Sequence, residues 1–495
     1  MTEGSAGVLL LDLLDGIAPL TITGDPAVDV RAVESDSRRV GPGACFACIP
    51  GERVDGHTFA PAAVAAGAVA LLVERPLGLG VVEAQVPAVR VALGPMAARA
   101  AGDPSRALRC LGVTGTNGKT TTTYLLQAVV GAGGERAGII GTTGARSGGA
   151  VVATGVTTPE APDLQALLVR MRADGVTTVA MEVSSHGLAQ HRVDGTWFTA
   201  ACFTNLSRDH LDFHGTMEAY FEAKARLFDP ERCGTAVTNV DDVHGREIAR
   251  RAAAAGVPVV TYARADRAAD VVATDVAVRA TATEFVLHDR RAGERTAVVL
   301  PLPGPHNVWN ALAAAATARA VDVPLDVVAA GLAAAPPVPG RFERVGADLP
   351  FTVLVDYAHT PDALTQAVAS ARALAGSGRL AVVFGCGGDR DRDKRGPMGA
   401  AAAAADLVLV TSDNPRSEDP AAIAAAAAAG VSAAGAEPVI VLDRRAAIAA
   451  ALDWAAPGDV VLVAGKGHET GQTAGGVTVA FDDRVVVGAL LEGRT

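Results

Sequence analysis

The feature that most limits how this chain can fold is an apolar run that ends in a glycine-bracketed turn. Residues 111–114 read LGVT and predict a strand, the next seven residues read GTNGKTT, and residues 119–132 suit a helix. A strand that passes through a tight glycine turn into a helix is typical of a parallel sheet with crossover helices. The sequence therefore predicts an α/β fold.

The same turn has the composition of a phosphate-binding loop. Gly115 and Gly118 let backbone N–H groups face an anion at the start of a helix, whose dipole favours negative charge. Lys119 would reach the β- and γ-phosphates, and the Thr120 hydroxyl would bind Mg²⁺. The general GxxxxGK[ST] pattern requires glycine where this chain has Val113, so the loop is a shorter GxxGKTT variant. A glycine-rich turn with an exposed lysine is the alternative, but the combination of strand, glycines, lysine and threonine favours nucleotide binding.

Boundaries in the chain indicate three domains, which also suits its length of 495 residues. The first 105 residues contain apolar runs at 68–73 and 88–93, interpreted as strands, and end in a Gly-Asp-Pro-Ser linker. Residues 333–341 read AAAPPVPGR, and prolines at this density cannot continue a helix or strand. We predict a small N-terminal α/β domain (1–105), a central P-loop ATPase-like parallel-sheet domain (106–338) and a C-terminal Rossmann-like domain (339–495).

Alternation of strands and helices continues in the C-terminal third. The alanine tracts at 400–405 and 421–429 predict helices, because alanine is the best helix former. Four apolar runs predict strands that each finish in a polar loop: residues 352–355, 380–384, 407–411 and 460–464. In the central part, residues 176–183 and 201–203 also predict strands.

Composition excludes several classes of protein. The balance of 43 basic and 54 acidic residues gives a net charge of −11, which argues against a nucleic-acid surface but allows an anionic small substrate at a locally cationic site. The longest apolar stretches fall short of the ~20 residues of a membrane span, and no basic flank of a secretory signal is present. Cys45 and Cys48 form a CxxC that we interpret as buried thiols, with redox or metal chemistry as the alternative. Six cysteines are too few for a disulfide scaffold, so the reducing cytoplasm is the expected compartment. We also expect a monomer, although the sequence itself does not give the oligomeric state.

Two polar residues at the ends of central strands are candidate metal ligands. Glu182 ends a strand expected to neighbour the phosphate loop, where a carboxylate oxygen suits a hard cation such as Mg²⁺. His210 follows the strand at 201–203 and could also bind a metal. Taken singly, Glu182 could be a solvated loop carboxylate and His210 could cap the next turn.

Lys224 lies in a predicted helix at 216–229. Helical spacing places it on the face of Phe221 and Phe228. Most lysines on such a face extend to water. A lysine drawn inward among metal ligands would have to lose its positive charge, and carbamylation by CO₂ would convert its nitrogen into an anionic oxygen donor.

Seven segments carry a resemblance over nearly the whole chain. They are GTNGKTT, MEVSSHGLAQHRV, TNLSRDHLDFHGT, YFEAKARLF, PGPHNVWNALAA, VDYAHTPDAL and SDNPRSEDP. Together and in this order they resemble the Mur ligases of peptidoglycan synthesis. The resemblance implies an ATP-dependent amide ligase in which the N-terminal domain holds a UDP-linked muramyl dipeptide, the central domain binds ATP, and the C-terminal domain brings the amino acid.

The resemblance also implies roles for individual residues. Lys224 would be a carbamylated lysine, and Glu182, His210 and Thr120 would share Mg²⁺ with it. The nucleotide would be bound by Gly115, Thr116, Asn117, Gly118, Lys119, Thr120, Thr121, Asn307, Asn310, Arg341 and Asp356. The muramyl dipeptide would be held by Ser37, Thr157, Thr158, Ser184, Gln190 and Arg192.

Some of these residues have simpler interpretations that the sequence leaves open. Asn307 and Asn310 flank a helix start and could be caps. Arg192 could form a surface ion pair, and Ser37 could serve only a turn.

Three C-terminal strands end in loops that should converge on the amino acid, because ligands of open α/β sheets bind outside the carboxyl ends of the strands. The DNPR tetrapeptide resembles the signature of family members that add diaminopimelate, whose distal end carries an ammonium and a carboxylate. Arg416 would supply a guanidinium fork for that carboxylate and Arg390 would serve the other one. The remaining predicted contacts are Asp413, Asn414, Pro415, Gly465 and Glu469. A β-turn begun by Asn414, or an open loop, is the structural alternative.

The chemistry implied is acyl activation, with formation of an acyl phosphate and ADP before the amine of diaminopimelate attacks. Three alternatives remain: a lysine-adding Mur ligase, a folylpolyglutamate synthase-like ligase, and a P-loop regulator that only hydrolyses ATP. The N-terminal domain and the DNPR loop speak against the folate enzyme.

Overall fold

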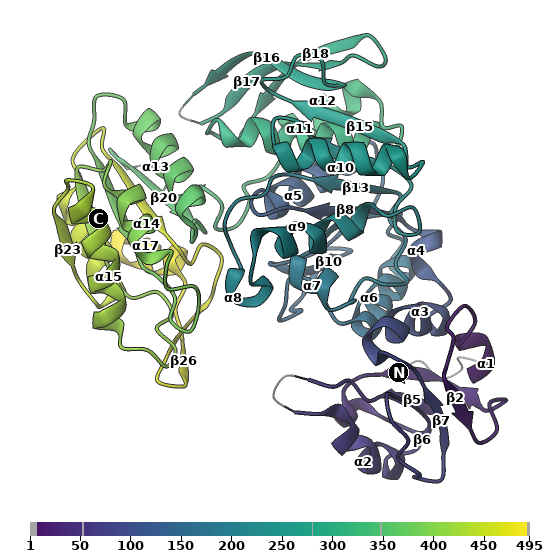
Figure 1. The fold of residues 1–495 in the computed structure, drawn as a ribbon. Helices are drawn as coiled ribbons and strands as arrows, with labels where there is room; N and C mark the ends of the chain where they lie inside the picture. Colours follow the sequence, from purple (N-terminus) through teal and green to yellow (C-terminus); the bar gives the residue numbers. More distant parts are fainter. Residues whose placement is uncertain (1–6, 52–53, 280, 347–348, 493–495) are drawn as a thin grey trace.

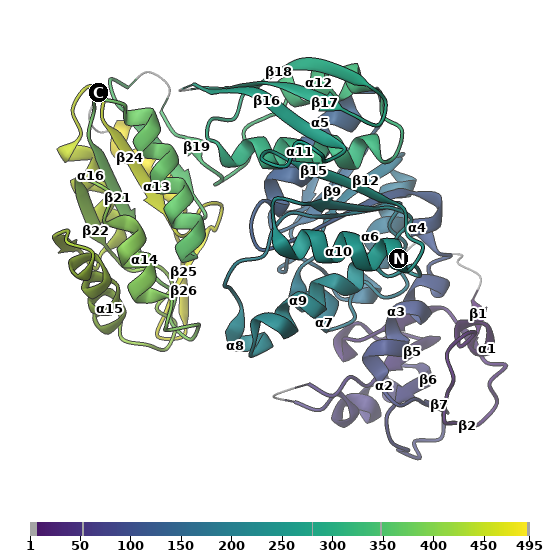
Figure 2. The same cartoon turned by 45° about the horizontal axis from the view of Figure 1, so that its top comes forward.

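The computed structural model describes residues 7–51, 54–279, 281–346 and 349–492. It has three α/β domains, each built on its own sheet (Figure 1). In Figures 1 and 2 the central domain lies between the N-terminal domain, drawn in purple, and the C-terminal domain, drawn in green and yellow.

The N-terminal domain has a five-stranded sheet in the order β2-β7-β6-β5-β4, in which β4 to β7 are parallel. Its apolar strand faces and helix α3 bury one core, and the other face of the sheet packs under α2. The elements are β1 (Val8–Leu9), α1 (Leu10–Leu13), β2 (Thr21–Thr23), β3 (Asp29–Val30), β4 (Ala32–Glu34), η1 (Ser37–Arg39), β5 (Ala44–Ala47), η2 (Gly56–Phe59), α2 (Ala60–Ala65), β6 (Ala68–Val73), β7 (Val82–Gln85), α3 (Val89–Ala100) and α4 (Pro104–Ala107).

The central domain has an eleven-stranded sheet in the order β11-β10-β9-β12-β8-β13-β14-β15-β16-β17-β18. The seven central strands of this order, β9-β12-β8-β13-β14-β15-β16, are parallel. At the two edges β10, β11, β17 and β18 are antiparallel, so the sheet predicted to be parallel is mixed. The strands are β8 (Arg109–Thr114), β9 (Ala137–Gly141), β10 (Gly144–Ser147), β11 (Ala150–Val152), β12 (Thr178–Glu182), β13 (Ala200–Phe203), β14 (Ala236–Asn239), β15 (Val259–Ala263), β16 (Val271–Val278), β17 (Thr283–Asp289) and β18 (Glu294–Leu300).

Helices cover both faces of the central sheet, because its strands bury apolar side chains on alternate sides. Leu111 and Val113 of β8 face the core under α5, α11 and α12, while Cys110 faces the opposite core. The helices are α5 (Lys119–Ala132), α6 (Ala161–Ala173), α7 (Ser185–Ala189), α8 (Leu211–His214), α9 (Met217–Ala225), η3 (Arg226–Phe228), α10 (Val243–Ala254), α11 (His306–Arg319) and α12 (Leu325–Ala333).

The C-terminal domain has a six-stranded sheet in the order β19-β20-β24-β21-β22-β23, parallel except for β19. Cores on both faces complete a Rossmann-like layered domain. The elements are β19 (Glu343–Arg344), β20 (Thr352–Asp356), α13 (Pro361–Ala375), β21 (Leu380–Phe384), α14 (Arg395–Ala402), β22 (Leu407–Val410), α15 (Pro420–Ala433), β23 (Pro438–Ile440), α16 (Arg444–Trp454), β24 (Val460–Ala464), β25 (Gly471–Ala474), β26 (Val477–Ala480) and α17 (Asp483–Glu492).

Most predicted strands and helices are confirmed, but residues 88–93 are not a strand. They begin α3, whose residues Val89, Leu93 and Met96 recur at helical spacing and are buried together. The tract at 421–429 lies inside α15. The tract at 400–405 is helical only to Ala402, where α14 ends, and this helix starts before the tract, at Arg395. No helix in the described ranges is long and apolar enough to cross a membrane.

Candidate functional site

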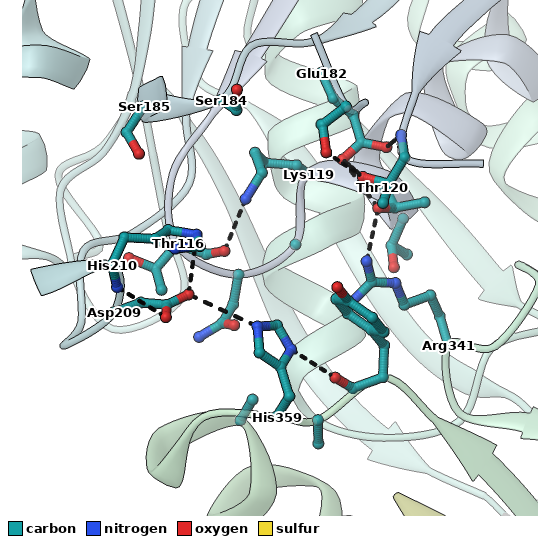
Figure 3. Close-up of a pocket in the computed structure, with 18 of the residues that line it drawn as sticks. Thr116, Lys119, Thr120, Glu182, Ser184, Ser185, Asp209, His210, Arg341 and His359 are labelled. Atoms are coloured by element: carbon teal, nitrogen blue, oxygen red, sulfur yellow. Dashed lines mark hydrogen bonds and ion pairs between the residues drawn. The ribbon is translucent and has the colours of Figure 1, made fainter. Parts of the chain in front are cut away.

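A cavity of about 540 Å³ lies where the central and C-terminal domains meet. Figure 3 shows side chains from both domains pointing into it, with Lys119 and Glu182 on one wall and Arg341 and His359 on the other. The carboxyl ends of the parallel strands β8, β12 and β13 open into this space, as expected for a ligand site of an α/β sheet.

The phosphate loop joins β8 to α5, and two of its glycines are required by geometry. Gly115 has φ +147° and Gly118 has φ +88°, both in the region that side chains disfavour. A Cβ atom would lie 1.9 Å from the Thr204 hydroxyl at Gly115, and 2.4 Å from the Asn310 amide oxygen at Gly118. The loop can therefore turn tightly under the helix start, as the sequence predicts.

Lys119 folds back over this loop. Its ammonium donates to the Gly115 carbonyl at 3.0 Å and to the Thr116 carbonyl at 2.9 Å. Burial lowers the pKa of Lys119, and Arg341 lowers it further, whereas Glu182 acts in the opposite direction. An entering polyphosphate would give this lysine the anionic partner that the loop carbonyls replace only in part.

Thr120 and Glu182 are in direct contact. The Thr120 hydroxyl donates to Glu182 Oε2 at 3.0 Å, and Arg341 Nη2 donates to the Thr120 hydroxyl at 2.9 Å. Thr142, which follows β9, donates its N–H to Glu182 Oε1 at 2.9 Å and its hydroxyl to Oε2 at 3.0 Å. Glu182 is thus an oriented, buried carboxylate, not a solvated one.

Lys224 is buried beside the loop, on the predicted face with Phe221 and Phe228. Its Nζ donates to the Gly115 carbonyl at 2.8 Å and lies 4.5 Å from the centre of the Tyr220 ring. Burial lowers the pKa of Lys224 well below its usual value, and the charge of Lys119 lowers it further. The environment therefore favours a neutral amine at this position.

His210 and Asp209 stand at the mouth between the two domains. His210 has φ +54° and immediately precedes α8 without a side-chain capping hydrogen bond, with Nε2 3.3 Å from the Asp209 carboxylate. Burial lowers the pKa of His210 to about 3. Burial alone would raise the pKa of Asp209, but His359, His210 and Lys394 together lower it.

The nucleotide-side residues from later in the chain also reach the larger cavity. Asn307 and Asn310 lie inside α11, which begins at His306 without a side-chain cap, so the capping alternative is wrong. Asn310 donates to Asn307 Oδ1 at 2.9 Å. Asp356 accepts the Phe342 N–H at 2.7 Å, and burial raises its pKa although Arg341 opposes the rise.

The residues predicted for the muramyl dipeptide line the same cavity, with one exception. Thr157, Thr158, Ser184, Gln190 and Arg192 contribute to its wall. Ser184 also caps α7, and Arg192 pairs with Glu160 at 3.0 Å, so the ion-pair alternative for Arg192 holds alongside its place in the wall. Ser37 lies in η1 of the N-terminal domain, apart from the residues that line the cavity.

A second cavity of about 230 Å³ adjoins the first at the carboxyl ends of β21, β22 and β24. Six of the seven predicted amino-acid contacts line it: Arg390, Asp413, Asn414, Arg416, Gly465 and Glu469. Pro415 does not. Asn414 starts no hydrogen-bonded turn with Ser417, and its side chain donates to Glu469 Oε2 at 2.9 Å. A turn starts one residue later, where the Glu418 N–H donates to the Pro415 carbonyl at 3.0 Å.

The two cavities share five wall residues. These are Asp209, His210, Tyr357, His359 and Arg390. His359 Nδ1 lies 2.9 Å from the Tyr357 carbonyl, while Nε2 faces Asp209 at 3.8 Å. The two cavities are therefore neighbours that border the same five side chains.

The donor atoms beside the loop suit a hard cation only in part. The Thr120 hydroxyl and Glu182 carboxylate are oxygen donors of the kind that Mg²⁺ prefers. In the described part of the chain, no three His, Cys, Asp or Glu side chains converge as a metal site. An ion held here would need further oxygens, from phosphate or from a modified Lys224.

Several residues of the site were not predicted from the sequence. Asp209 and His359 lie in two of the segments that carry the family resemblance, which was the available signal for them. Thr142 follows β9 in a segment without any motif, and its contact with Glu182 becomes visible only in the folded chain. Cys45 and Cys48 are buried, as interpreted, in the N-terminal core, where burial raises the pKa of both thiols to about 12.

Comparison with known proteins gives consistent matches along the chain. The Mur ligase middle domain matches residues 113–318, the Mur ligase glutamate ligase domain matches 340–467, and the Mur ligase family catalytic domain matches 29–102. The UDP-N-acetylmuramoyl-L-alanyl-D-glutamate–2,6-diaminopimelate ligase of Streptomyces coelicolor is 46% identical over 493 residues, covering 97% of this chain and 94% of that protein.

Solved structures agree. A structure of a UDP-N-acetylmuramoyl-L-alanyl-D-glutamate–2,6-diaminopimelate ligase superposes with a TM-score of 0.72 at 36% identity, covering 99% of each chain. The folylpolyglutamate synthase of Mycobacterium tuberculosis, complexed with ADP and AMPPCP, shares the fold with a TM-score of 0.62 at 21% identity. It covers only 76% of this chain and 92% of its own.

Proposed function

The chain belongs to the Mur ligase family, and we propose that it joins 2,6-diaminopimelate to UDP-N-acetylmuramoyl-L-alanyl-D-glutamate with ATP, in peptidoglycan precursor synthesis. The observation that carries this function is the pair of adjoining cavities. One has a phosphate loop, and the other has an arginine and a carboxylate suited to the distal end of a diamino acid.

We assign the three domains to three substrates. Residues 1–105 would hold the UDP end of the muramyl substrate, 106–338 would bind ATP, and 339–495 would bring the amino acid. Because residues of the central and C-terminal domains complete both cavities within one chain, the enzyme would act as a monomer. Its buried, unpaired cysteines suit a reducing cytoplasm.

ATP phosphates would lie against the GTNGKTT loop, with Lys119 and Arg341 as cationic partners. In the structure both side chains donate hydrogen bonds to neighbouring oxygens of the protein. Phosphate oxygens could take the place of these acceptors. Asn307, Asn310 and Asp356 border the same space and would contact the rest of the nucleotide.

The muramyl dipeptide would extend from the N-terminal domain to Glu182 and Thr142. Arg192, already anchored by Glu160 and the Thr158 carbonyl at 2.9 Å, offers a guanidinium to the substrate's carboxylate. Thr157, Ser184 and Gln190 add polar contacts in the same wall. Ser37 would contribute at the uridine end.

We further propose that Lys224 carries a carbamate formed with CO₂. The reaction requires a neutral amine, and the depressed pKa of Lys224, caused by burial and Lys119, provides one. The modified side chain would add anionic oxygens beside Thr120 and Glu182, with His210 nearby. A bound Mg²⁺ ion would neutralise charge between phosphate and carboxylate.

The reaction would proceed by acyl transfer. The γ-carboxylate of the D-glutamyl residue attacks the γ-phosphorus of ATP, giving an acyl phosphate and releasing ADP. The amine of diaminopimelate then attacks the acyl carbon, the C–O bond to phosphate breaks, and a proton leaves the nitrogen. Lys119 and Arg341 bind the transferred phosphoryl group, so most of the rate would come from positioning and electrostatic stabilisation.

One experiment tests this function. Purified protein is incubated with ATP, with or without UDP-muramyl dipeptide, and with diaminopimelate, with lysine or with neither amino acid, and ADP release and product mass are measured. We expect a product heavier than the dipeptide by the mass of diaminopimelate less water. ADP release should depend on both UDP-muramyl dipeptide and diaminopimelate. A lysine adduct of equal yield would assign the lysine-adding reaction, and ADP release independent of both substrates would make the protein an ATPase.

A further inference from the structure

A fully buried lysine stands behind the smaller cavity. Lys466 directly follows Gly465 at the end of β24, and its side chain is 0% exposed. It does not line the cavity itself. A charged group in this position is costly unless oxygen atoms surround it, so its partners show what it is there to hold.

In the described part of the chain Lys466 has three hydrogen-bond partners, and all are oxygens in or next to the wall of the cavity. Its Nζ donates to the Gly471 carbonyl at 2.6 Å, to Glu469 Oε2 at 3.1 Å and to Asn414 Oδ1 at 3.5 Å. Two of these partners, Asn414 and Glu469, line the cavity.

The orientation of the Asn414 amide is fixed by this arrangement. Its Oδ1 accepts from Lys466 and from the Thr473 N–H at 2.9 Å, so its Nδ2 must face Glu469 Oε2, 2.9 Å away. Glu469 Oε2 therefore receives two hydrogen bonds, from Lys466 and Asn414. Among the residues that the structure describes, none donates a hydrogen bond to the other carboxylate oxygen, Oε1, and Glu469 lines the cavity.

The hairpin β25–β26 locks the same lysine from the other side. Gly471 begins β25, and the Arg416 N–H donates to the Thr473 carbonyl of that strand at 2.9 Å. Lys466 thus links three chain segments that meet at the cavity: the DNPR loop, the loop after β24, and the hairpin labelled β26 at the lower end of the C-terminal domain in Figure 1.

We propose that Lys466 is a positioning residue for the amino-acid substrate. It holds the Asn414 amide and the Glu469 carboxylate so that Glu469 Oε1 meets the distal ammonium of a diamino acid while Arg416 meets the neighbouring carboxylate. The proposal rests on the function proposed above, and assigns to Lys466 a role in substrate capture without contact with the substrate.

The test is Lys466→Met, which keeps the length of the side chain and removes its charge. We expect the KM for diaminopimelate to rise about 10- to 100-fold, since Glu469 and Asn414 lose a charge-assisted partner. The KM for ATP and the kcat should stay within about two-fold of the wild type. Because Lys466 acts through Glu469, the double variant with Glu469→Gln should raise the KM by much less than the product of the single effects.

The matched control is Asp459→Asn, at the opposite end of β24. Asp459 is 4% exposed and pairs with Arg379 at 2.7 Å, so this variant weakens the same domain without touching the cavity. It should lower Tm and leave the KM for diaminopimelate unchanged. If Lys466→Met behaves like the control, it lowers Tm and leaves the KM for diaminopimelate unchanged. Lys466 would then serve the stability of the domain and not substrate capture.

The proposal is overturned by an unchanged KM for diaminopimelate, by an equal rise in the KM for ATP, or by multiplicative effects in the double variant. Lys466→Gln is the second variant if the methionine protein does not fold, and failure of both to fold would also overturn it, since the lysine would then serve the domain as a whole. If the wild type ligates no diaminopimelate, the proposed function itself fails, which is a different result.

Discussion

Arg416 gives the sharpest test of the amino-acid pocket. Its guanidinium lies against Gly387, where a Cβ atom would come 3.0 Å from Nη1, and this Nη1 donates to the Gly388 carbonyl at 2.7 Å. The rest of the fork remains for a ligand. The backbone of Arg416 is held by the hairpin, through its N–H to Thr473 at 2.9 Å and its carbonyl to Gly475 at 2.7 Å. The side chain can therefore be changed without releasing the loop.

The expected magnitude follows from the hydrogen bonds at stake. Arg416→Lys keeps the charge and loses the second arm of the fork, which costs one charge-assisted hydrogen bond, about 1.5–3 kcal/mol. The KM for diaminopimelate should then rise about 10- to 150-fold. The KM for ATP should not change, because Arg416 lines only the smaller cavity.

A glycine variant separates the side chain from the backbone. Arg416 has φ +53°, a conformation that glycine adopts without strain, so Arg416→Gly removes the guanidinium and relieves the backbone at once. It should lose more affinity for diaminopimelate than the lysine variant, with no loss of Tm. The control is Arg392→Lys, whose side chain is 71% exposed, pairs with Glu418 and lies outside the cavity.

The assay is steady-state ADP release with diaminopimelate or ATP varied, and the product mass identifies which amino acid was added. Wild-type KM values for diaminopimelate in both Arg416 variants would refute the assignment of this pocket, as would a rise shared equally by ATP.

Two further predictions concern chemistry and stability. Lys224→Ala should abolish ligation, and a small exogenous carboxylate should restore part of it by replacing the carbamate oxygens; undiminished activity without the carboxylate would remove the carbamate. In Asp194, burial would raise the carboxyl pKa, but hydrogen bonds from His191 and Arg232 lower it to about 2. Because the folded pKa lies below the unfolded value, its contribution of about 2 kcal/mol is present above pH ~4 and is lost as the pH falls towards 2. Asp194→Asn should therefore lower the free energy of unfolding in urea at pH 7 by that amount and hardly at all at pH 2, and an equal loss at both pH values would contradict the electrostatic cause.

The phosphate loop could be predicted because its determinants are adjacent in the chain. Strand, glycines, Lys119 and helix lie within about twenty residues, and α5 has the predicted bounds. The face of Lys224 could also be predicted, since it follows from helical spacing alone. Where a local pattern suits two structures, as at 88–93, the sequence was misleading: the short apolar run suggested a strand, but these residues begin a helix that is buried against the N-terminal core.

Contacts between distant segments could not be predicted. Thr142 reaches Glu182 because the neighbouring strands β9 and β12 end side by side. Lys466 reaches Asn414 across the end of β21, which lies between β24 and β22 in the sheet. From the sequence Asn307 and Asn310 could equally have been helix caps. The structure excludes this because α11 begins at His306 and both residues lie inside the helix. The antiparallel strands β17 and β18 extend the central sheet away from the site, and none of the sequence motifs that predicted the site includes their residues.

The net charge of −11 does not conflict with the two anionic substrates proposed here, ATP and the UDP-linked dipeptide, because the field at the site is set by its own walls. The larger cavity has three carboxylates, Glu182, Asp209 and Asp356, against five basic side chains, Lys119, Lys224, Arg192, Arg341 and Arg390. Lys119 and Lys224 both bond the Gly115 carbonyl, at 3.0 and 2.8 Å, and two ammonium groups so close repel each other. The carboxylate of Glu182 raises the pKa of Lys119 and so favours its charged form. The charge of Lys119 in turn lowers the pKa of Lys224, which burial already lowers. The charge of Lys119 therefore helps to keep the pKa of Lys224 low, as the carbamate proposed above requires.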